Sequence, residues 1–193
     1  MKFTVLMGSP RKQGNTNAIL CPFIDELNTQ GHETELFWLY DMNIAGCVAC
    51  RACQEDWSIF GCKFNDDMQK VFDSIYACDH IVLACPIYSW YCTAPMKAAL
   101  DRLVYGMNKY YGREKGPSLW AGKKVSLIVT CGYRPEKGAD LFETGMQRYC
   151  KHSQLIYAGM YAERDLGYNA TFMDNEKEQN ARDFAKLLVV CDN

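Results

Sequence analysis

The stretch KFTVLMGSPRKQGNTNAILCPFIDELNTQG, from Lys2 to Gly31, decides the fold that we expect for this chain. It begins with a short, continuously apolar run, which is typical of a buried strand. A loop rich in Gly, Ser, Pro and Asn follows, and apolar residues then recur at helical spacing from Thr16 to Gln30, where Gly31 ends the pattern. A buried strand that leads through such a loop into an amphipathic helix is the first unit of an α/β sheet.

The same alternation of strand and helix repeats along the rest of the chain. Strand-like apolar runs cover residues 33–40, 80–88, 123–131 and 153–162, and helical patterns cover residues 66–77, 95–105, 136–151 and 176–190. Alternating strands and helices predict a parallel sheet with helices on both faces, and strands covered on both sides are continuously apolar, as these are. Because no repeat or linker-like composition interrupts the pattern, we expect a single domain over residues 1–193, with a cysteine-rich insertion loop at residues 46–62.

The bulk composition excludes several classes of partner. The chain has 193 residues, of which 49% are hydrophobic and 23% charged, and its formal net charge is −2. This balance gives no reason to expect nucleic acid or an acidic membrane surface as a partner. No segment approaches the roughly 20 apolar residues that span a bilayer, and the N-terminal apolar run is too short for a signal peptide. We therefore expect a cytoplasmic protein, where a reducing environment disfavours disulfides among the 11 cysteines.

The loop after the first strand has the features of an anion site. Ligands of open parallel sheets bind outside the carboxyl ends of the strands, and a helix N-terminus attracts anions there. The loop differs from the nucleotide P-loop because Gly14 is followed by Asn15 instead of Lys. Its donors suit a phosphate monoester, and they are Ser9, Arg11, Asn15 and Thr16. The alternative is a plain helix cap made by Asn15 or Thr16.

The loops after the third and fourth strands carry aromatic residues that do not follow a periodic face. The first, PIYSWYCTAP, contains Tyr88, Trp90 and Tyr91, and the second, TCGYRPEKG, contains Gly132 and Tyr133. A planar ring needs flat apolar walls and backbone groups that bond its polar edge. Gly132 permits close approach of the backbone, and Tyr133 can cover one face of a ring. The alternative is that these aromatic residues pack on a neighbouring loop or on another subunit.

The insertion loop GCVACRACQEDWSIFGC places four cysteines close together. Cys47, Cys50 and Cys53 follow at steps of three, and Cys62 follows after eight further residues. Such spacing indicates a metal site, a disulfide framework or redox chemistry. Three-residue steps suit the corner of an iron–sulfur cluster, whereas zinc sites more often use two separated pairs. Structural thiols without any metal are the third interpretation. By contrast, the cysteines that lie in or beside apolar runs are expected to be core residues, namely Cys78, Cys85 and Cys131.

Taken together, these segments resemble the flavodoxin-like NAD(P)H-dependent FMN reductases. The resemblance rests on GSPRKQGNT, the cysteine segment, DDM at Asp66 to Met68, and CPIYSWYCTAPMKAALDR at Cys85 to Arg102, a little over half of the chain. The compact four-cysteine motif is similar to that of the iron–sulfur flavoprotein branch, although related reductases often keep several such cysteines without a cluster. The resemblance implies a three-layer fold with a five-stranded parallel sheet in the order 2-1-3-4-5, bound FMN, and a homodimer or homotetramer with FMN near a subunit interface.

The resemblance also implies which residues bind the cofactors. The phosphate loop maps to Ser9, Arg11, Asn15 and Thr16, and the ring-binding loop maps to Pro86, Ile87, Tyr88, Ser89 and Trp90. Gly132 and Tyr133 are a weaker transfer, since the region after Gly132 is less alike. A cluster, if present, would have Cys47, Cys50, Cys53 and Cys62 as its ligands. We assign no catalytic side chain, because hydride transfer between nicotinamide and flavin requires no protein acid or base.

We therefore expect an enzyme that passes electrons from NAD(P)H through FMN to a small-molecule or protein acceptor. The first alternative is an iron–sulfur flavoprotein or flavodoxin-like electron carrier that serves protein partners, but a carrier is usually strongly acidic near its flavin. The second is a non-flavin protein with a structural zinc site. For an oligomer, we expect exposed apolar surface at Trp90, Tyr91 and the run from Tyr105 to Gly112. The three histidines, including His80, lie at element boundaries and are expected to cap elements or contact solvent.

Overall fold

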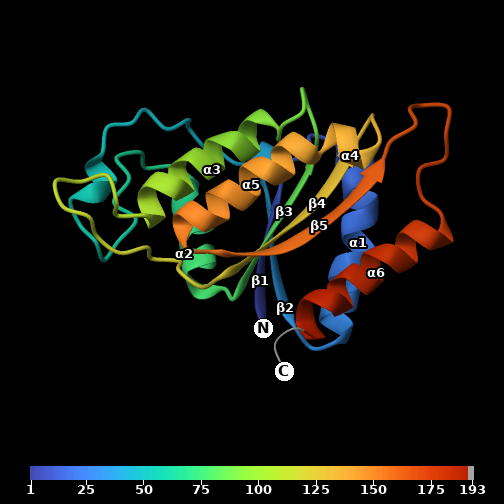
Figure 1. Ribbon diagram of the computed structural model, residues 1–193, viewed down its shortest axis with the longest axis horizontal. Helices are drawn as coiled ribbons and strands as arrows, with labels where there is room; N and C mark the ends of the chain where they lie inside the picture. The colour runs from blue at the N-terminus through green and yellow to red at the C-terminus, as the bar shows by residue number, and fades with distance from the viewer. Residues whose placement is uncertain (191–193) are drawn as a thin grey trace.

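The computed structural model describes residues 1–190 and contains a five-stranded sheet in the order β2-β1-β3-β4-β5 (Figure 1). All neighbouring strands run parallel. The strands are β1 (Lys2–Met7), β2 (Glu33–Trp38), β3 (His80–Pro86), β4 (Lys124–Cys131) and β5 (Ile156–Arg164). The predicted fold class and strand order are therefore confirmed.

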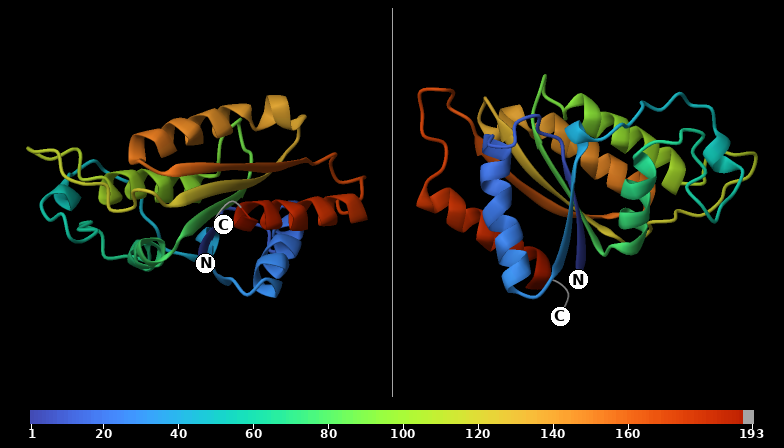
Figure 2. Two further views of the ribbon diagram at one scale, coloured as in Figure 1. Left: turned by 60° about the horizontal axis from the view of Figure 1, so that its bottom comes forward. Right: turned by 180° about the vertical axis from the view of Figure 1, so that it is seen from behind.

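Helices cover both faces of this sheet and bury a separate apolar cluster on each (Figure 2). One face carries α1 (Asn15–Thr29) and α6 (Asn175–Val190), which contact each other. The other face carries α2 (Met68–Ala77), α3 (Ala94–Met107) and α5 (Asp140–Ser153). Each strand of the centre is therefore buried on both sides, which explains its continuous apolar sequence.

Two local expectations need correction. The helix expected over residues 136–151 is divided at Ala139 into the short α4 (Pro135–Gly138) and α5. His80 does not lie at a solvent-exposed boundary: its side chain is fully buried, stacks on Phe3 and hydrogen-bonds Ser126 through Nε2 at 3.0 Å. The reason is that β3 is the central strand, so even its first residue lies between β1 and β4. Cys78, Cys85 and Cys131 are buried, as predicted.

The cysteine-rich insertion follows β2 and lies beside the segment that follows α3, although the two are about 50 residues apart. Figure 1 places both at one end of the molecule, at the C-terminal end of α3. The loop between β3 and α3 lies at the opposite end of that helix. Within residues 1–190, no helix combines the length and apolar character that crossing a bilayer requires.

Candidate functional site

The loop after β1 is held rigidly against the sheet and leaves the N-terminus of α1 open. Gly8 donates its N–H to the carbonyl of Ala84 at 2.7 Å, and the Ser9 carbonyl accepts a hydrogen bond from Trp38 Nε1 at 2.7 Å. Ser9 Oγ accepts the N–H of Arg11 at 3.2 Å. The N-cap of α1 is Gly14, and no side chain caps the helix. The alternative of a cap by Asn15 or Thr16 is therefore wrong, and the N-terminal N–H groups stay available to an anion.

The predicted phosphate-loop residues occupy two different environments. Arg11 and Asn15 line an open hollow of about 280 Å³ together with residues that follow β5, namely Asp165, Gly167, Tyr168 and Ala170. Thr16 is buried instead, and its Oγ1 lies 2.8 Å from Thr130 Oγ1 at the end of β4. Arg11 and Asn15 therefore face the hollow beside the N-terminus of α1, while Thr16 ties α1 to the sheet. Sequence reasoning missed the segment after β5.

The loop after β3 forms a tight left-handed turn. Tyr88 and Tyr91 exchange two backbone hydrogen bonds of 2.9 and 3.0 Å, and the two residues between them, Ser89 and Trp90, have φ values of 50° and 62°. Two successive positive φ values are the signature of a type I′ turn, which usually contains Asn or Gly. The Thr93 hydroxyl then donates to the Gly8 carbonyl at 2.7 Å and joins this loop to the phosphate loop.

A second hollow, of about 240 Å³, lies between the loops after β3 and β4. Its lining contains five residues for which ring binding was predicted, namely Ile87, Ser89, Trp90, Gly132 and Tyr133, together with Cys131 and Gly138, for which it was not. The rings of Trp90 and Tyr133 stack with centroids 5.8 Å apart and planes 13° apart. Pro86 and Tyr88 do not line this hollow: Pro86 ends β3, and Tyr88 closes the turn.

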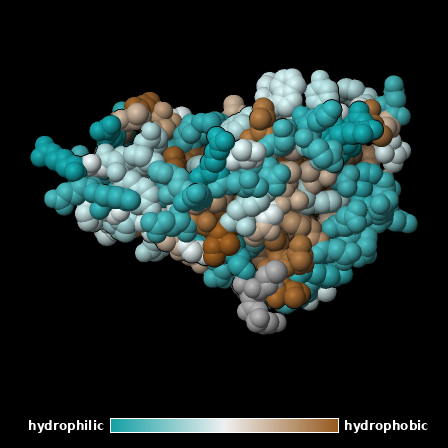
Figure 3. Space-filling model, in the orientation of Figure 1, coloured by the Kyte–Doolittle hydropathy of each residue, from teal (hydrophilic) through white to brown (hydrophobic). Residues whose placement is uncertain are grey.

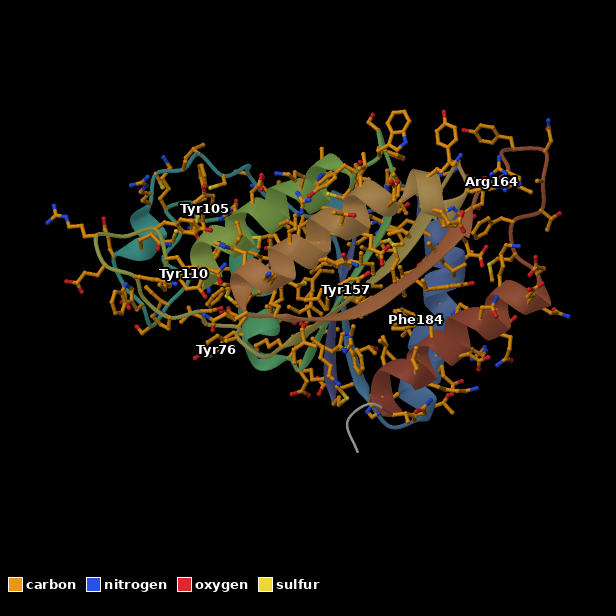
Figure 4. All side chains as sticks on the ribbon, in the orientation of Figure 1. Tyr76, Tyr105, Tyr110, Tyr157, Arg164 and Phe184 are labelled. Carbon is orange, nitrogen blue, oxygen red and sulfur yellow. The ribbon has the colours of Figure 1, made fainter. Side chains whose placement is uncertain are left out.

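The two hollows belong to one edge of the sheet and fit FMN. Their walls are joined where Asp165 donates its N–H to the Cys131 carbonyl at 2.8 Å and Arg164 Nε donates to the Gly132 carbonyl at 3.2 Å. Figure 4 labels Arg164 at this edge. An open helix N-terminus beside Arg11 suits a phosphate, and a hollow with stacked aromatic rings suits a planar ring. No described backbone or side-chain atom lies within 4 Å of the position that a Cβ on Gly132 would occupy, so this backbone faces open space.

The four predicted cysteines line one pocket at the other end of α3. Besides Cys47, Cys50, Cys53 and Cys62, its lining is largely apolar and aromatic and includes Val48, Ala49, Arg51, Phe60, Phe64, Arg102 and Tyr105. Ala49 and Arg51 alternate with the first cysteines and have φ values of 52° and 63°. These left-handed residues reverse the direction of the chain between successive thiols, which lets an irregular loop present them to one space. Figure 4 labels Tyr105 at this end of the molecule.

Two buried cations flank the thiol pocket. Arg102, from α3, donates from Nη2 to Cys62 Sγ at 3.2 Å. Lys109, just after α3, is fully buried and donates to the carbonyls of Cys53 at 2.7 Å and Ile59 at 2.6 Å. Burial lowers the pKa of Lys109. Sequence reasoning missed the contacts of Arg102 and Lys109 with the cysteine loop. The expectation that the whole run from Tyr105 to Gly112 lies at the surface was wrong, because the centre of this run packs under the cysteine loop.

Four thiols supply the ligand type of a zinc site and of an iron–sulfur cluster. The ten cysteines among residues 1–190 are all free thiols. In the same part of the chain, no three His, Cys, Asp or Glu side chains are placed to hold one metal ion. Zinc would require its sulfur ligands about 2.3 Å from a common point, whereas an iron–sulfur cluster is held by thiolates on separate corners. Four thiols around one apolar pocket, with a cation beside Cys62, supply the ligand type of such a cluster.

Comparisons with known proteins identify the family of the chain. Residues 1–141 match the family model described as NADPH-dependent FMN reductase. The chain belongs to this family. A protein of Archaeoglobus fulgidus called "Iron-sulfur flavoprotein" is 34% identical to this FMN reductase family member over 159 residues, which cover 82% of the chain and 68% of the relative. An "Iron-sulfur flavoprotein" of Methanosarcina thermophila is 34% identical over 104 residues, which cover 54% of the chain and 53% of the relative.

Comparison with solved structures shows a similar fold over nearly the whole chain. The NAD(P)H:quinone oxidoreductase from Methanothermobacter marburgensis superposes with a TM-score of 0.73 over 98% of this chain and 97% of its own, at 19% sequence identity. At that identity the likeness concerns the fold. This FMN reductase family member spans about half the length of the Methanosarcina relative.

Proposed function

We propose that this protein is an FMN-dependent NAD(P)H oxidoreductase that delivers electrons through an iron–sulfur cluster to a small-molecule or protein acceptor. The observation that carries the flavin part is the uncapped N-terminus of α1, with Arg11 and Asn15 beside it, at the same sheet edge as the Trp90–Tyr133 hollow. Bound there, FMN would accept a hydride from a nicotinamide and release the electrons to an acceptor.

In this scheme the residues of the chain bind FMN and orient its ring. Arg11, Asn15 and the first N–H groups of α1 bind the phosphate, and Ser9 keeps the loop in shape through its bond to the Arg11 N–H. Trp90 and Tyr133 flank the ring hollow. Neither needs to transfer a proton, so the protein contributes to catalysis by positioning two rings.

The cysteine pocket supports the cluster over the alternative of structural thiols. Thiols that served only for loop packing would not need to converge from both ends of the insertion loop on one pocket beside Arg102. Cys47, Cys50, Cys53 and Cys62 are then the ligands. The cluster would carry electrons singly. The thiols of such a site require a reducing compartment, which supports a cytoplasmic location.

The arrangement also supports a homodimer or homotetramer. The flavin edge and the thiol pocket of one chain lie at opposite ends of α3, which has 14 residues. At 1.5 Å per residue this helix is about 20 Å long. A second chain that placed its thiol pocket against the flavin edge of the first would shorten the electron path considerably. FMN would then lie near a subunit interface.

Anaerobic purification followed by a visible spectrum and assays of iron, sulfide and flavin tests the proposal. We expect one FMN and about four irons and four sulfides per chain, and steady NAD(P)H consumption with a quinone or free flavin as acceptor. Cys50→Ser should abolish iron binding while FMN remains. Cys21→Ser, which changes an exposed cysteine of α1 outside the pocket, should change neither.

The flavin, the cluster and the oxidation of NAD(P)H would each be contradicted by a different result. Colourless protein with stoichiometric zinc would contradict the flavin and the cluster together. Iron-free protein that still oxidises NAD(P)H through FMN would contradict the cluster alone. A yellow protein that does not oxidise NAD(P)H would indicate an electron carrier for protein partners.

A further inference from the structure

Arg102 makes a set of contacts that a residue serving only to hold α3 would not need. Its side chain is 1% exposed, and Nη1 pairs with Asp66 Oδ2 at 2.5 Å. On the same guanidinium, Nη2 donates to Cys62 Sγ at 3.2 Å. The third group, Nε, is buried and has no hydrogen-bond partner among the described residues. Arg102 also lines the pocket into which the four thiols converge.

Asp66 fixes the direction in which this guanidinium points. Its carboxylate accepts the N–H of Ala45 at 3.0 Å and the N–H of Met68 at 3.2 Å, so it is anchored at the start of the helix α2 as well as to Arg102. The carboxylate is itself buried, with 6% of its side chain exposed. Arg102 is therefore held in a buried ion pair, and its Nη2 N–H is directed at Cys62.

A fixed cation with an N–H directed at a ligand sulfur has a defined electrostatic consequence. When a cluster takes up one electron, negative charge grows on its sulfur atoms, and no bond is made or broken. Hydrogen bonds to the sulfurs, net charge nearby and solvent exposure determine how favourable this uptake is. Solvent and salt screen a buried charge much less than an exposed one. Arg102 should therefore favour the reduced cluster, and the more remote Asp66 carboxylate should oppose it.

We propose that Arg102 is a positioning residue that raises the reduction potential of the cluster through its hydrogen bond to Cys62, and that Asp66 partly offsets this effect. This inference rests on the cluster in the proposed function. It assigns to an ion pair buried in the fold a function in electron transfer, in addition to joining α2 and α3.

Variants of Arg102 and of Asp66 distinguish control of the cluster potential from a purely structural function of the ion pair. If the pair only held the fold together, Arg102→Gln and Asp66→Asn would break the same bridge and change the cluster in the same direction. Electrostatic control predicts opposite changes. Arg102→Gln removes the cation and lowers the potential, whereas Asp66→Asn leaves the cation beside Cys62 and raises it. Arg102→Lys keeps the charge without the fixed fork, and should give an intermediate value.

The measurement is a redox titration of the anaerobically purified protein with bound FMN and cluster, followed by visible absorbance and electron paramagnetic resonance. At a fixed solution potential we expect Arg102→Gln to lower the ratio of reduced to oxidised cluster about tenfold, which is 59 mV for a one-electron couple. Asp66→Asn should raise the same ratio. The flavin in each sample gives a second potential, which should shift less than that of the cluster because Arg102 hydrogen-bonds the cluster ligand Cys62 directly.

Two further variants complete the experiment. Lys97→Gln breaks an exposed ion pair with Asp101 on the same helix and should leave the cluster potential unchanged. The double variant Arg102→Gln with Asp66→Asn leaves no buried charge unpaired, so it keeps the test available if a single variant fails to fold. We expect the double variant to have a lower potential than the wild type, by less than Arg102→Gln alone.

The inference is overturned if both single variants shift the cluster potential in the same direction, if neither shifts it, or if the double variant alone is measurable and matches the wild type. Wild-type protein that binds FMN but no iron would overturn the cluster and this inference together. That result is distinguishable from the others because it appears in the iron assay before any titration.

Discussion

Ser89 and Trp90 hold the turn after β3 in a left-handed conformation although neither is glycine. Non-glycine residues in this region cost on the order of 1–3 kcal/mol each, and they persist where the surrounding structure over-determines them. Here the reciprocal bonds between Tyr88 and Tyr91 and the stacking of Trp90 on Tyr133 supply that constraint. At the scale of single residues, strain therefore coincides with the predicted flavin edge.

A first prediction concerns Arg11 and Asn15. Arg11 is exposed, and its side chain has no hydrogen-bond or ion-pair partner among the described residues, so its loss should change thermal stability little. Hydrogen bonds to a charged group contribute about 1.5–3 kcal/mol each, so Arg11→Ala with Asn15→Ala should weaken FMN binding at least about tenfold. Flavin release followed by fluorescence titration measures this.

Lys12→Ala is the matched control, because Lys12 is a neighbouring exposed cation that pairs with Asp41 and lies over Trp38, away from the hollow. It should leave FMN affinity unchanged. Unchanged affinity in the Arg11 and Asn15 double variant would show that the phosphate lies elsewhere.

At the scale of elements, α3 connects the flavin edge with the cysteine loop. The helix begins at the flavin edge, and its last turn packs against the loop. Gly106, in its last turn, would place a Cβ 2.0 Å from the ring of Phe60, so only glycine allows the loop to lie this close. Gln54 then donates to the Tyr105 carbonyl at 2.6 Å, and Lys109 donates to two carbonyls of the loop. The insertion is thus fixed to α3 and the segment after it by the packing of Phe60 and by the polar bonds of Gln54 and Lys109.

A second prediction follows for Lys109. Lys109→Met keeps the aliphatic length but leaves the carbonyls of Cys53 and Ile59 without their donor. Unsatisfied buried acceptors cost about 1–3 kcal/mol each, so the free energy of unfolding should fall by about 2 kcal/mol or more. Urea unfolding monitored by tryptophan fluorescence measures this. Lys115→Met changes an exposed cation over the Tyr110 ring and should have little effect; equal losses in both variants would contradict the role of Lys109.

A third prediction concerns acid. Burial raises the pKa of Asp66, but the hydrogen bonds from Arg102, Ala45 and Met68 outweigh it, so its pKa is lowered in the folded protein. The unfolded chain then binds more protons than the folded one below about pH 4, so stability present above that pH is lost as the pH falls. Asp66→Asn should lower stability at pH 7 and flatten its decline below pH 4 in urea titrations. A decline as steep as in the wild type would indicate that other carboxylates dominate.

At the scale of the whole molecule, β5 is an edge strand that its helices cover only partly. Most of its residues are half-buried, and Ile156 is 50% exposed. Figure 3 shows apolar side chains on this face of the molecule, near the C-terminal end of α6, where Leu187 and Val190 are 57% and 68% exposed. Long, partly apolar edges invite pairing with another chain. Trp90 and Tyr133 at the flavin edge are exposed as well.

A fourth prediction is therefore an oligomer. Light scattering at micromolar concentration should give a particle of two or four chains, larger than the 22.1 kDa of one chain. Charged substitutions at the exposed aromatic residues of the flavin edge, such as Trp90→Glu, should shift the particle toward the monomer if that edge is the interface. A 22 kDa particle in the wild type would contradict the oligomer itself.

Sequence alone was sufficient for the order of elements, the parallel sheet and the family, because continuous apolar strands and glycine-bearing loops encode them locally. It also identified the cysteine segment and the loops after β1, β3 and β4. The assignment of those loops to FMN stays a prediction. Residue spacing could not, however, distinguish a helix cap from an open helix N-terminus, because both use the same short polar residues in the same order.

Only the tertiary structure decided which distant residues complete each site. Arg102 and Lys109 meet the cysteine loop across about 40 to 60 residues of chain, and the segment after β5 closes the phosphate hollow. The tertiary structure also showed that the centre of the Tyr105 to Gly112 run is buried. The Lys109 ammonium group hydrogen-bonds carbonyls of the cysteine loop instead of contacting solvent. The physical reason is that a side chain's partners depend on which surfaces fold together, and a local pattern specifies the period of an element but not its neighbours.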